Sequence, residues 1–221
     1  MTKLVLFDFD GTLADSAPDL AATANRFRAE QGLDALPYDI LRPYSSQGAR
    51  GLLKAALDMD TTHPDYLDYR ERFLADYASN MTQLTTLFEG VDTLLERLQD
   101  DGYSWGIVTN KLEYLALPLI EHLGLAEHCR ITVGGDTTAY TKPHPAPLLY
   151  AAEKAGFEPA DCIYIGDDER DIVAAHAAGM ASVVAAYGYC LNDPNINNWN
   201  ALAVSHTVDE IWPVVKSWAQ P

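Results

Sequence analysis

Cysteine and long apolar runs are both scarce in this sequence of 221 residues. The three cysteines, Cys129, Cys162 and Cys190, form no C-x-x-C pair, which favours buried or half-buried thiols over a disulfide framework, a zinc site or a redox centre. No stretch approaches about 20 uncharged apolar residues, so we expect no membrane-spanning helix and no membrane partner. Lys3 is followed by a short apolar run and then by charges, unlike a signal peptide, so we expect a cytoplasmic protein.

Positive charge is also scarce. The chain has 15 Lys and Arg residues against 32 Asp and Glu residues, which gives a formal net charge of −17. Such a chain repels polyphosphate backbones, so we expect no nucleic-acid partner. An anionic substrate would need a local cation or a metal ion to overcome this field.

After Gly90 the sequence alternates between short apolar runs and amphipathic segments. Hydrophobic residues make up 48% of the chain, enough for a sizeable core. The alternation predicts an α/β fold in which helices cover both faces of a doubly wound parallel sheet. The expected strands are 4–7, 105–109, 130–133, 162–165 and 182–186, and the expected helices are 91–98, 115–123, 147–155 and 171–178.

The segment between Pro18 and about Leu87 has a helical pattern instead. Its apolar residues recur at helical spacing, and no convincing strand interrupts them. We therefore expect an inserted helical domain at residues 16–87 and a core made of residues 1–15 and 88–221. Four aromatic side chains are expected to form the core of the insertion rather than a binding platform: Tyr66, Tyr69, Phe73 and Tyr77.

Polar side chains follow several of the predicted strands. The first strand ends in Asp8 and Asp10, although an unpaired buried carboxylate costs several kcal/mol or more. In open α/β sheets, ligands bind outside the carboxyl ends of the strands, where the strand order reverses. The other polar residues that follow strands are Thr109, Asn110, Lys111, Asp136, Lys142 and the run from Gly166 to Asp171.

Carboxylates gathered at one edge of a sheet need a cation, and oxygen ligands select a hard one such as Mg²⁺. Asp8, Asp167 and the backbone carbonyl of Asp10 can supply the protein ligands. Lys142 adds a fixed positive charge and Thr109 a hydroxyl donor. This set fits a phosphoryl group, whose oxygens a metal ion and a lysine can hold while a carboxylate attacks in line.

Four short motifs, in chain order, resemble those of the haloacid dehalogenase superfamily. They are D-F-D-G-T at Asp8–Thr12, the strand end Thr109–Asn110, Lys142–Pro143, and G-D-D-x-x-D at Gly166–Asp171. The resemblance covers essentially the whole chain, because the helical insertion is similar to the mobile helical cap of that family. It implies a Rossmann-like core with an inserted cap domain.

The resemblance also implies roles for the residues at the strand ends. Asp8 would be the nucleophile and form an aspartyl-phosphate. Asp10 would protonate the leaving alcohol and then activate water. Thr109 and the Asn110 amide would hold the phosphoryl oxygens, and Lys142 would neutralise the nucleophile and the phosphate.

The implied metal site takes Mg²⁺ on Asp8, Asp10, Asp167 and Asp171. Asp171 would either bind the metal ion or orient a metal-bound water and Lys142. Asp168 departs from many relatives, which have a small hydroxyl residue there, and its charge could bind a metal-bound water or point to solvent. Glu169 and Arg170 are expected to form a solvated surface pair.

Asp10 favours an oxygen leaving group, because a halide leaving group needs no proton. We therefore expect a Mg²⁺-dependent phosphatase that acts on a small phosphorylated metabolite, as a monomer or homodimer. A sugar phosphate mutase of the same family keeps both aspartates and a similar cap, so it remains the alternative enzyme. A non-catalytic binding protein on the same scaffold would turn over no phosphomonoester.

Substrate choice is expected to depend on the helical insertion. Its run Ser45–Gly51 contains Gly48 and Arg50. The glycine-flanked run offers backbone amides, and the Arg50 guanidinium offers a bidentate hydrogen-bond donor for a carboxylate. A plain surface arginine is the alternative interpretation of Arg50. Together with Asn110 and Gly11 of the D-x-D-G-T motif, these residues are expected to bind the phosphate or the rest of the substrate.

Two resemblances bear on the substrate. The run Ser45–Gly51 is similar to the cap loop of phosphoglycolate phosphatases. Tyr187–Tyr189 and Asn197–Ala201 look closer to N-acetylmuramic acid 6-phosphate phosphatases, which favours the amino-sugar phosphate. Both substrates carry a carboxylate, so Arg50 does not distinguish them.

Overall fold

The computed structural model describes residues 3–190 and 193–220 and divides the chain into two units. The first unit joins Met1–Ala14 to Leu87–Pro221, and the second is the continuous segment Asp15–Thr86. The chain passes from one unit to the other within two short strands, β2 (Ala14–Asp15) and β3 (Thr86–Leu87).

A parallel sheet of six strands forms the centre of the first unit, in the order β5-β4-β1-β6-β7-β8. Its strands are β1 (Leu4–Phe7), β4 (Ser104–Val108), β5 (Thr132–Val133), β6 (Cys162–Gly166), β7 (Ala181–Ala185) and β8 (Ala203–Ser205). β1 pairs with a strand on each side and is buried along its whole length. An unbroken apolar run is what a strand buried on both faces requires.

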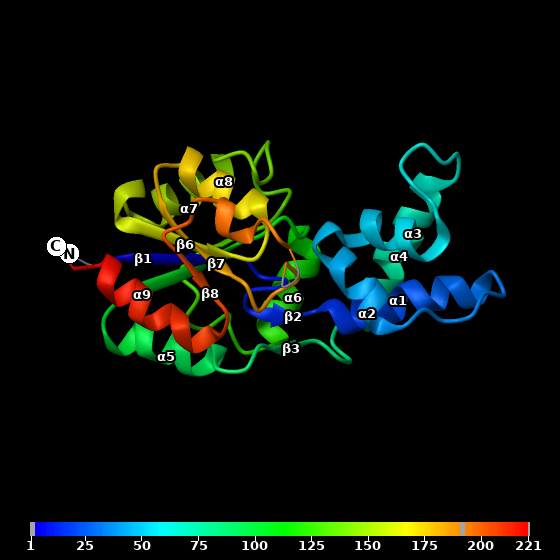
Figure 1. The fold of residues 1–221 in the computed structure, drawn as a ribbon, viewed down its shortest axis with the longest axis horizontal. Coiled ribbons are helices and arrows are strands. Elements are labelled where there is room, and N and C mark those ends of the chain that lie inside the picture. Colours follow the sequence, from blue (N-terminus) through cyan, green and yellow to red (C-terminus); the bar gives the residue numbers. More distant parts are fainter. Residues whose placement is uncertain (1–2, 191–192, 221) are drawn as a thin grey trace. The chain divides into compact units, whose positions relative to one another are not determined.

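Helices cover both faces of this sheet. They are α5 (Val91–Asp100), α6 (Glu113–His122), α7 (Ala146–Ala155), α8 (Glu169–Ala177) and α9 (Ile211–Trp218), with the 3₁₀ helices η2 (Pro159–Asp161), η3 (Ile196–Asn198) and η4 (Val208–Glu210). Figure 1 shows α7 and α8 on one face of the sheet and α5 and α9 on the other. The predicted fold class, a doubly wound parallel α/β core with a helical insertion, is confirmed.

The strand order reverses at β1. The chain runs from β1 to its neighbour β4 and on to the edge strand β5, and then returns to β6 on the other side of β1. Phe7, the last residue of β1, is paired in register with Ile107 of β4 and Ile165 of β6. The residues that follow these three strands therefore emerge together at one edge of the sheet, where open α/β folds bind ligands.

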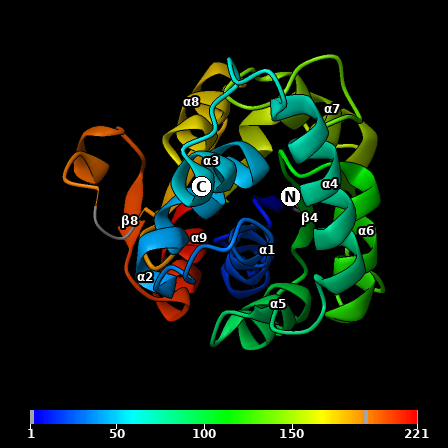
Figure 2. The same cartoon turned by 90° about the vertical axis from the view of Figure 1, so that its right-hand side faces the viewer.

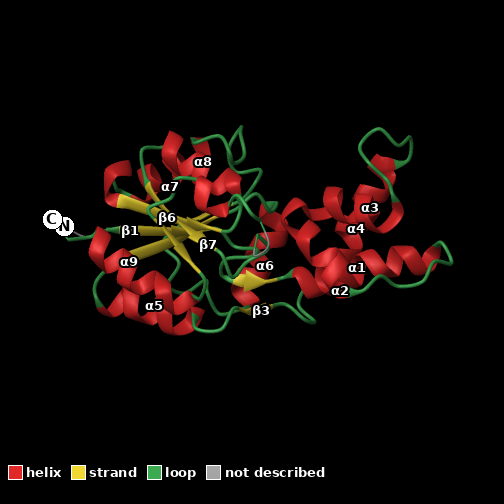
Figure 3. Ribbon diagram, viewed as in Figure 1, coloured by secondary structure: helices red, strands yellow, loops and turns green. Residues whose placement is uncertain are grey.

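The second unit is built from helices (Figure 3). They are α1 (Ala17–Glu30), α2 (Tyr38–Leu41), α3 (Gly48–Leu57) and α4 (Tyr66–Asn80), with the 3₁₀ helix η1 (Arg42–Gln47) before α3. Phe27 of α1 packs on Phe73 and Tyr69 of α4, with ring centroids 5.6 and 6.1 Å apart. The predicted aromatic core of this unit is confirmed, because Tyr66, Phe73 and Tyr77 are buried.

Near the C-terminus, the strand β8 and the helix α9 lie outside the predicted set. β8 is only three residues long, and it is a strand because it pairs in parallel with β7. α9 has Pro213 in its first turn, where the missing N–H costs no helical hydrogen bond. The predicted strand at 130–133 is shorter, Thr132–Val133, and the predicted helix at 171–178 begins earlier, at Glu169.

The connection between β7 and β8 is anchored by one tryptophan. Trp199 packs with Ile172 of α8 and Val184 of β7 in a small hydrophobic cluster. Figure 2 shows the described part of this connection (orange) beside β8. The burial of a large aromatic side chain offsets the ordering of a segment that is otherwise rich in asparagine.

Asp19 ties the first turn of α1 to the end of the helical unit. Its side chain is buried and accepts hydrogen bonds from the N–H groups of Leu84 and Thr85, at 3.0 and 2.8 Å, and from the Thr85 hydroxyl, at 2.8 Å. A negative charge near a helix N-terminus is also favoured by the helix dipole. This carboxylate therefore satisfies several buried donors at once.

Asp19→Ala is expected to lower the free energy of unfolding by about 2–4 kcal/mol, because several buried donors lose their acceptor. Urea unfolding followed by circular dichroism measures this change. Asp68→Ala is the control, because it removes a carboxylate of α4 whose side chain is 70% exposed. Its expected effect is below about 0.5 kcal/mol. Equal losses in the two variants would contradict the role given to Asp19.

Candidate active site

Asp8 directly follows the central strand β1. Its N–H donates to the carbonyl of Ile165 on β6 at 2.8 Å, which continues the parallel ladder past the end of β1. Its Oδ1 accepts a hydrogen bond from the Phe9 N–H at 2.7 Å and lies 2.9 Å from Nζ of Lys142. The orientation of this carboxylate is therefore held by two donors.

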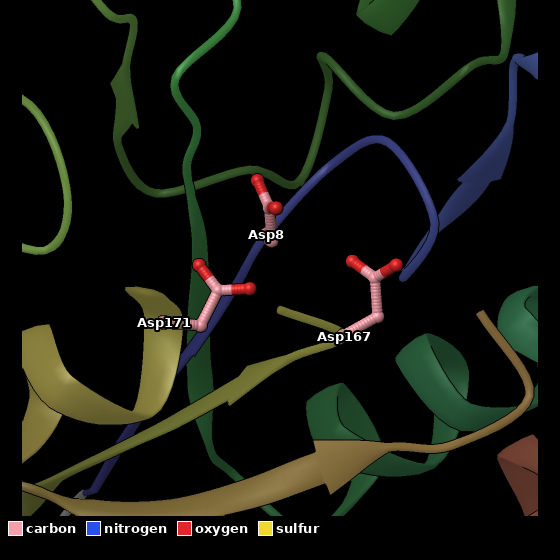
Figure 4. A group of neighbouring side chains, drawn as sticks. All are labelled: Asp8, Asp167 and Asp171. Carbon is pink, nitrogen blue, oxygen red and sulfur yellow. The ribbon is translucent and has the colours of Figure 1, made fainter. Parts of the chain in front are cut away.

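Asp167 and Asp171 lie beside Asp8, and Figure 4 shows the three side chains projecting to the same side of the strand ends. Asp167 follows β6, and Asp171 lies in the first turn of α8. One carboxylate oxygen from each of the three residues lies within 4.8 Å of the others. Asp167 and Asp171 are only 2% and 1% exposed.

Burial and mutual repulsion make this group of carboxylates costly to charge. Burial, with the negative charges of Asp8 and Asp171, raises the pKa of Asp167 well above its usual value. Burial also raises the pKa of Asp171, although the nearby Lys142 opposes the rise. The site holds more negative than positive charge, which a divalent cation would relieve.

Two glycines allow the backbone to approach these carboxylates. A Cβ at Gly11, whose φ is +84°, would meet the carboxylate of Asp167, with its Cγ only 2.6 Å away. A Cβ at Gly166 would meet Asp171, whose own Cβ would lie at 2.6 Å. Side chains at these positions would displace the carboxylates, which accounts for the glycines in D-F-D-G-T and G-D-D.

The donor set fits a hard divalent cation. All three side chains offer carboxylate oxygens, and Gly11 and Gly166 leave the carboxylates of Asp167 and Asp171 in place beside Asp8. Oxygen ligands without nitrogen or sulfur are those that Mg²⁺ takes in proteins. The repulsion among the three side chains gives a bound cation a stabilising role beyond ligation.

Lys142 is the buried cation among these carboxylates, with 3% of its surface exposed. Its Nζ lies 2.9 Å from Asp8 and 2.7 Å from Asp171, and it donates to the Val108 carbonyl at 3.0 Å and to the Tyr164 hydroxyl at 2.7 Å. Burial alone lowers the pKa of Lys142, but Asp171 and Asp8 together raise it above its usual value. The lysine therefore stays charged, as a fixed positive charge among the carboxylates requires.

Asn110 holds the backbone of Lys142. Its Oδ1 accepts the Lys142 N–H and its Nδ2 donates to the Lys142 carbonyl, both at 2.9 Å. Thr109 is buried, its N–H donates to the Val133 carbonyl at 2.9 Å, and its Oγ1 accepts the Lys111 N–H at 3.2 Å. The structure thus brings the residues that follow β4 against the Lys142 segment.

Two residues of the site were not assigned a role from the sequence. Lys111 pairs with Asp10, with its Nζ 3.0 and 3.2 Å from the two carboxylate oxygens. Tyr164, fully buried in β6, accepts from Lys142 and donates to the Val108 carbonyl at 2.6 Å. The position of Lys111 just after a strand was a usable signal, whereas a tyrosine inside an apolar strand resembles ordinary core.

Other predicted residues have structural partners. Asp168 caps α8 by accepting the Arg170 N–H at 2.9 Å, and it pairs with the Arg170 guanidinium at 2.8 Å. Glu169 is exposed and Arg170 is half-buried, and Arg170 has Asp168 as a charged partner. Asp136, another residue that follows a strand, accepts the Glu113 N–H at the start of α6.

Gly48 and Arg50 belong to the helical unit. Gly48 opens α3 with φ +57°, and Arg50 is exposed in the first turn of that helix. Their expected contact with substrate stays a prediction. The three cysteines are confirmed as free thiols, with Cys162 buried and the other two half-buried.

Residues 5–185 match the haloacid dehalogenase-like hydrolase family. The chain belongs to this family. It is 44% identical over 220 residues to a phosphoglycolate phosphatase from Xanthomonas campestris pv. campestris, which covers 99% of this chain and 98% of the relative. It is 36% identical to an N-acetylmuramic acid 6-phosphate phosphatase from Pseudomonas putida, over 94% of this chain and 93% of the relative.

A solved structure agrees with these sequence relatives. The crystal structure of a predicted phosphoglycolate phosphatase from Haemophilus somnus superposes with a TM-score of 0.85 at 30% identity, covering 97% of this chain and 98% of the other. The predicted family and the predicted enzyme class, a phosphatase of this family, are confirmed. Among the helices that the structure describes, none is long and apolar enough to cross a membrane.

Asp167→Asn is expected to stabilise the metal-free protein at about pH 8. Folding raises the pKa of Asp167, so the folded chain binds the proton of this carboxyl more tightly than the unfolded chain does. The cost of ionising Asp167 in the folded state therefore grows as the pH rises from about 4 to the raised pKa, and this cost lowers the free energy of unfolding. Melting temperatures in a chelating buffer at about pH 5 and pH 8 measure the effect. The gain should be larger at the higher pH.

The matched control is Asp100→Asn, at an exposed position of α5. It is expected to leave the pH dependence of the melting temperature unchanged. An Asp167→Asn variant that melts below the wild type at about pH 8 would show that this carboxylate is compensated without a cation.

Proposed function

We propose that this protein is a Mg²⁺-dependent phosphomonoester phosphatase that acts through an aspartyl-phosphate on Asp8. The observation that carries the proposal is the shared ammonium of Lys142, which joins Asp8 to Asp171 beside Asp167 at the edge of the sheet. A carboxylate held next to a fixed cation is a suitable nucleophile for a phosphoryl group. Similarity to named phosphatases over nearly the whole chain supports the same reaction.

In the first half-reaction the Asp8 carboxylate attacks phosphorus and the bond to the alcohol oxygen breaks. Asp10, two residues further along, gives its proton to that oxygen. In the second half-reaction Asp10 takes a proton from water, which attacks phosphorus and releases Asp8 and phosphate. Lys111, paired with Asp10 at 3.0 Å, holds this carboxylate in one position between the two steps.

The remaining site residues bind the phosphoryl group. Thr109 would donate its hydroxyl to a phosphoryl oxygen, and Asn110 would donate its backbone amide, because its side chain is engaged with Lys142. Gly11 supports the loop that carries the nucleophile. A bound Mg²⁺ would supply positive charge that offsets the negative charge on the phosphoryl oxygens. The residues that would hold it are Asp8, Asp167, Asp171 and, through its backbone carbonyl, Asp10.

We further propose that the helical unit, predicted at residues 16–87, is a cap domain that selects the substrate. The substrate class is a small phosphomonoester that carries a carboxylate, which Arg50 would bind. The higher identity to a phosphoglycolate phosphatase favours 2-phosphoglycolate, whereas Tyr187–Tyr189 and Asn197–Ala201 favour N-acetylmuramic acid 6-phosphate. The cytoplasmic location and the monomeric or homodimeric state stay predictions.

Phosphate release from 2-phosphoglycolate, N-acetylmuramic acid 6-phosphate and β-glucose 1-phosphate tests this proposal. With Mg²⁺ we expect one of the two acids to be turned over far faster than the others, and a chelator should abolish that activity. Asp8→Asn keeps the size of the side chain and removes the nucleophilic charge, so its rate should fall at least about 10³-fold.

The outcomes separate the alternatives. Slow and equal release from all three esters would leave the phosphatase reaction and remove the substrate assignment. Conversion of β-glucose 1-phosphate to an isomeric sugar phosphate, without phosphate release, would establish the mutase. Wild-type protein no faster than Asp8→Asn on every ester would contradict catalysis by Asp8.

Arg50→Ala is expected to raise the KM for the preferred acid by about 10- to 100-fold, with kcat changed little, because a charge-assisted hydrogen bond to the substrate carboxylate is lost. Arg70→Ala, at an exposed position of α4 in the same unit, is the control and should change neither constant. An unchanged KM in Arg50→Ala would remove this residue from the substrate site.

A further inference from the structure

The segment that follows β7, Tyr187-Gly188-Tyr189, contacts both of the loops that carry the carboxylates. We propose that this segment, here named the strap, positions Asp167 and the Asp8–Thr12 loop and thereby sets the affinity of the site for a divalent cation. The inference rests on the proposed function, because it concerns the metal ion that the phosphatase reaction would use. None of the four motifs includes the strap.

Gly188 is packed directly against the site. A Cβ at this position would meet the Gly11 carbonyl, and it would lie 2.5 Å from Cβ and 2.7 Å from Oδ2 of Asp167. Cβ atoms in proteins essentially never lie within 3.0 Å of a heavy atom to which they are not bonded through the local chain. Even the smallest side chain at Gly188 therefore has to displace Asp167 or the Gly11 backbone, which are both parts of the candidate metal site.

Tyr189 fixes the same carboxylate through its backbone. Its N–H donates to Oδ2 of Asp167 at 2.8 Å. The Gly188 N–H in turn donates to the Ala185 carbonyl at 3.0 Å, which turns the chain immediately after β7. The donor that orients Asp167 is thus anchored to a strand of the sheet rather than to a free loop.

Tyr187 holds the other loop. Its hydroxyl donates to the Thr12 carbonyl at 2.9 Å, and its ring packs edge-on against Phe88 with centroids 5.2 Å apart. Thr12 in turn donates its hydroxyl to Oδ1 of Asp167 at 3.4 Å. The strap therefore connects the loop after β1 with the loop after β6 from the side of β7.

Groups that orient metal ligands have measurable effects on binding. Mutation of such outer partners typically costs about 10- to 100-fold in metal affinity or activity. Gly188→Ala keeps every ligand and changes only the position of Asp167 and the Gly11 backbone. It should therefore raise the dissociation constant for Mg²⁺ by about 10- to 100-fold.

The test is a titration of the substrate-free, full-length protein with Mg²⁺, followed by the melting temperature. A ligand that binds only the folded state stabilises it by RT ln(1 + [L]/Kd), so the rise of the melting temperature with Mg²⁺ concentration gives the dissociation constant. The control is Gly102→Ala. There φ is +80° and no heavy atom lies within 4 Å of the added methyl group, so backbone strain lowers stability without touching the site. This control should lower the starting melting temperature and leave the Mg²⁺ dissociation constant unchanged.

Tyr187→Phe is the second variant, for the case that Gly188→Ala does not fold. It keeps the ring against Phe88 and removes only the hydroxyl bonded to Thr12. One lost hydrogen bond predicts a rise of about 2- to 10-fold in the Mg²⁺ dissociation constant.

Two contrary results have different meanings. If the wild type binds Mg²⁺ and both strap variants bind it equally well, the positioning role of the strap is contradicted and the proposed function stands. If the wild type shows no Mg²⁺-dependent stabilisation and its phosphatase activity survives a chelator, the metal site itself is overturned, and the strap with it.

Discussion

The site depends on one buried ion network, in which Lys142 neutralises carboxylates from two elements. Its Nζ lies 2.9 Å from Asp8, after β1, and 2.7 Å from Asp171, at the start of α8. Removing one partner from a buried ion pair typically costs about 3–5 kcal/mol, so the nucleophile, the lysine and α8 depend on one another. Asn110 accepts a hydrogen bond from the backbone N–H of Lys142, and the Tyr164 hydroxyl accepts one from its ammonium group.

The network leaves negative charge uncompensated, and the fold maintains this excess. Asp167 lies beside Asp8 and Asp171, and the ion pairs of Lys142 are with Asp8 and Asp171. Gly11 and Gly166 leave room for Asp167 and Asp171 at their places beside Asp8, because a Cβ at either glycine would collide with one of these carboxylates. The metal-free site therefore stores repulsion that a cation or a protonation event can relieve. Functional sites commonly carry such costs, and the buried sheet beneath supplies the stability that tolerates them.

The sequence predicted the site residues that short motifs at the strand ends mark, but it did not predict those whose role depends only on contacts formed in the fold. Asp8, Lys142 and Asp167 could be placed together because parallel strands end at a common edge and short motifs mark those ends. Tyr164 and Gly188 could not be found in this way, since a tyrosine in a buried strand and a glycine in a turn have ordinary structural roles. β8 was missed because a strand of three residues carries too little periodicity, and only its pairing with β7 specifies it.

Trapping the covalent intermediate tests the central claim most directly. Asp10→Asn protein can be mixed with acetyl phosphate, whose leaving group needs little protonation, and quenched with borohydride, which reduces an acyl phosphate to an alcohol. Because hydrolysis would lack its general base, we predict that the phosphoenzyme accumulates and that peptide mapping finds the reduced side chain at Asp8. Asp8→Asn in the same experiment should give no reduced residue. Reduction at Asp167 or Asp171, or none at any residue, would contradict Asp8 as the nucleophile.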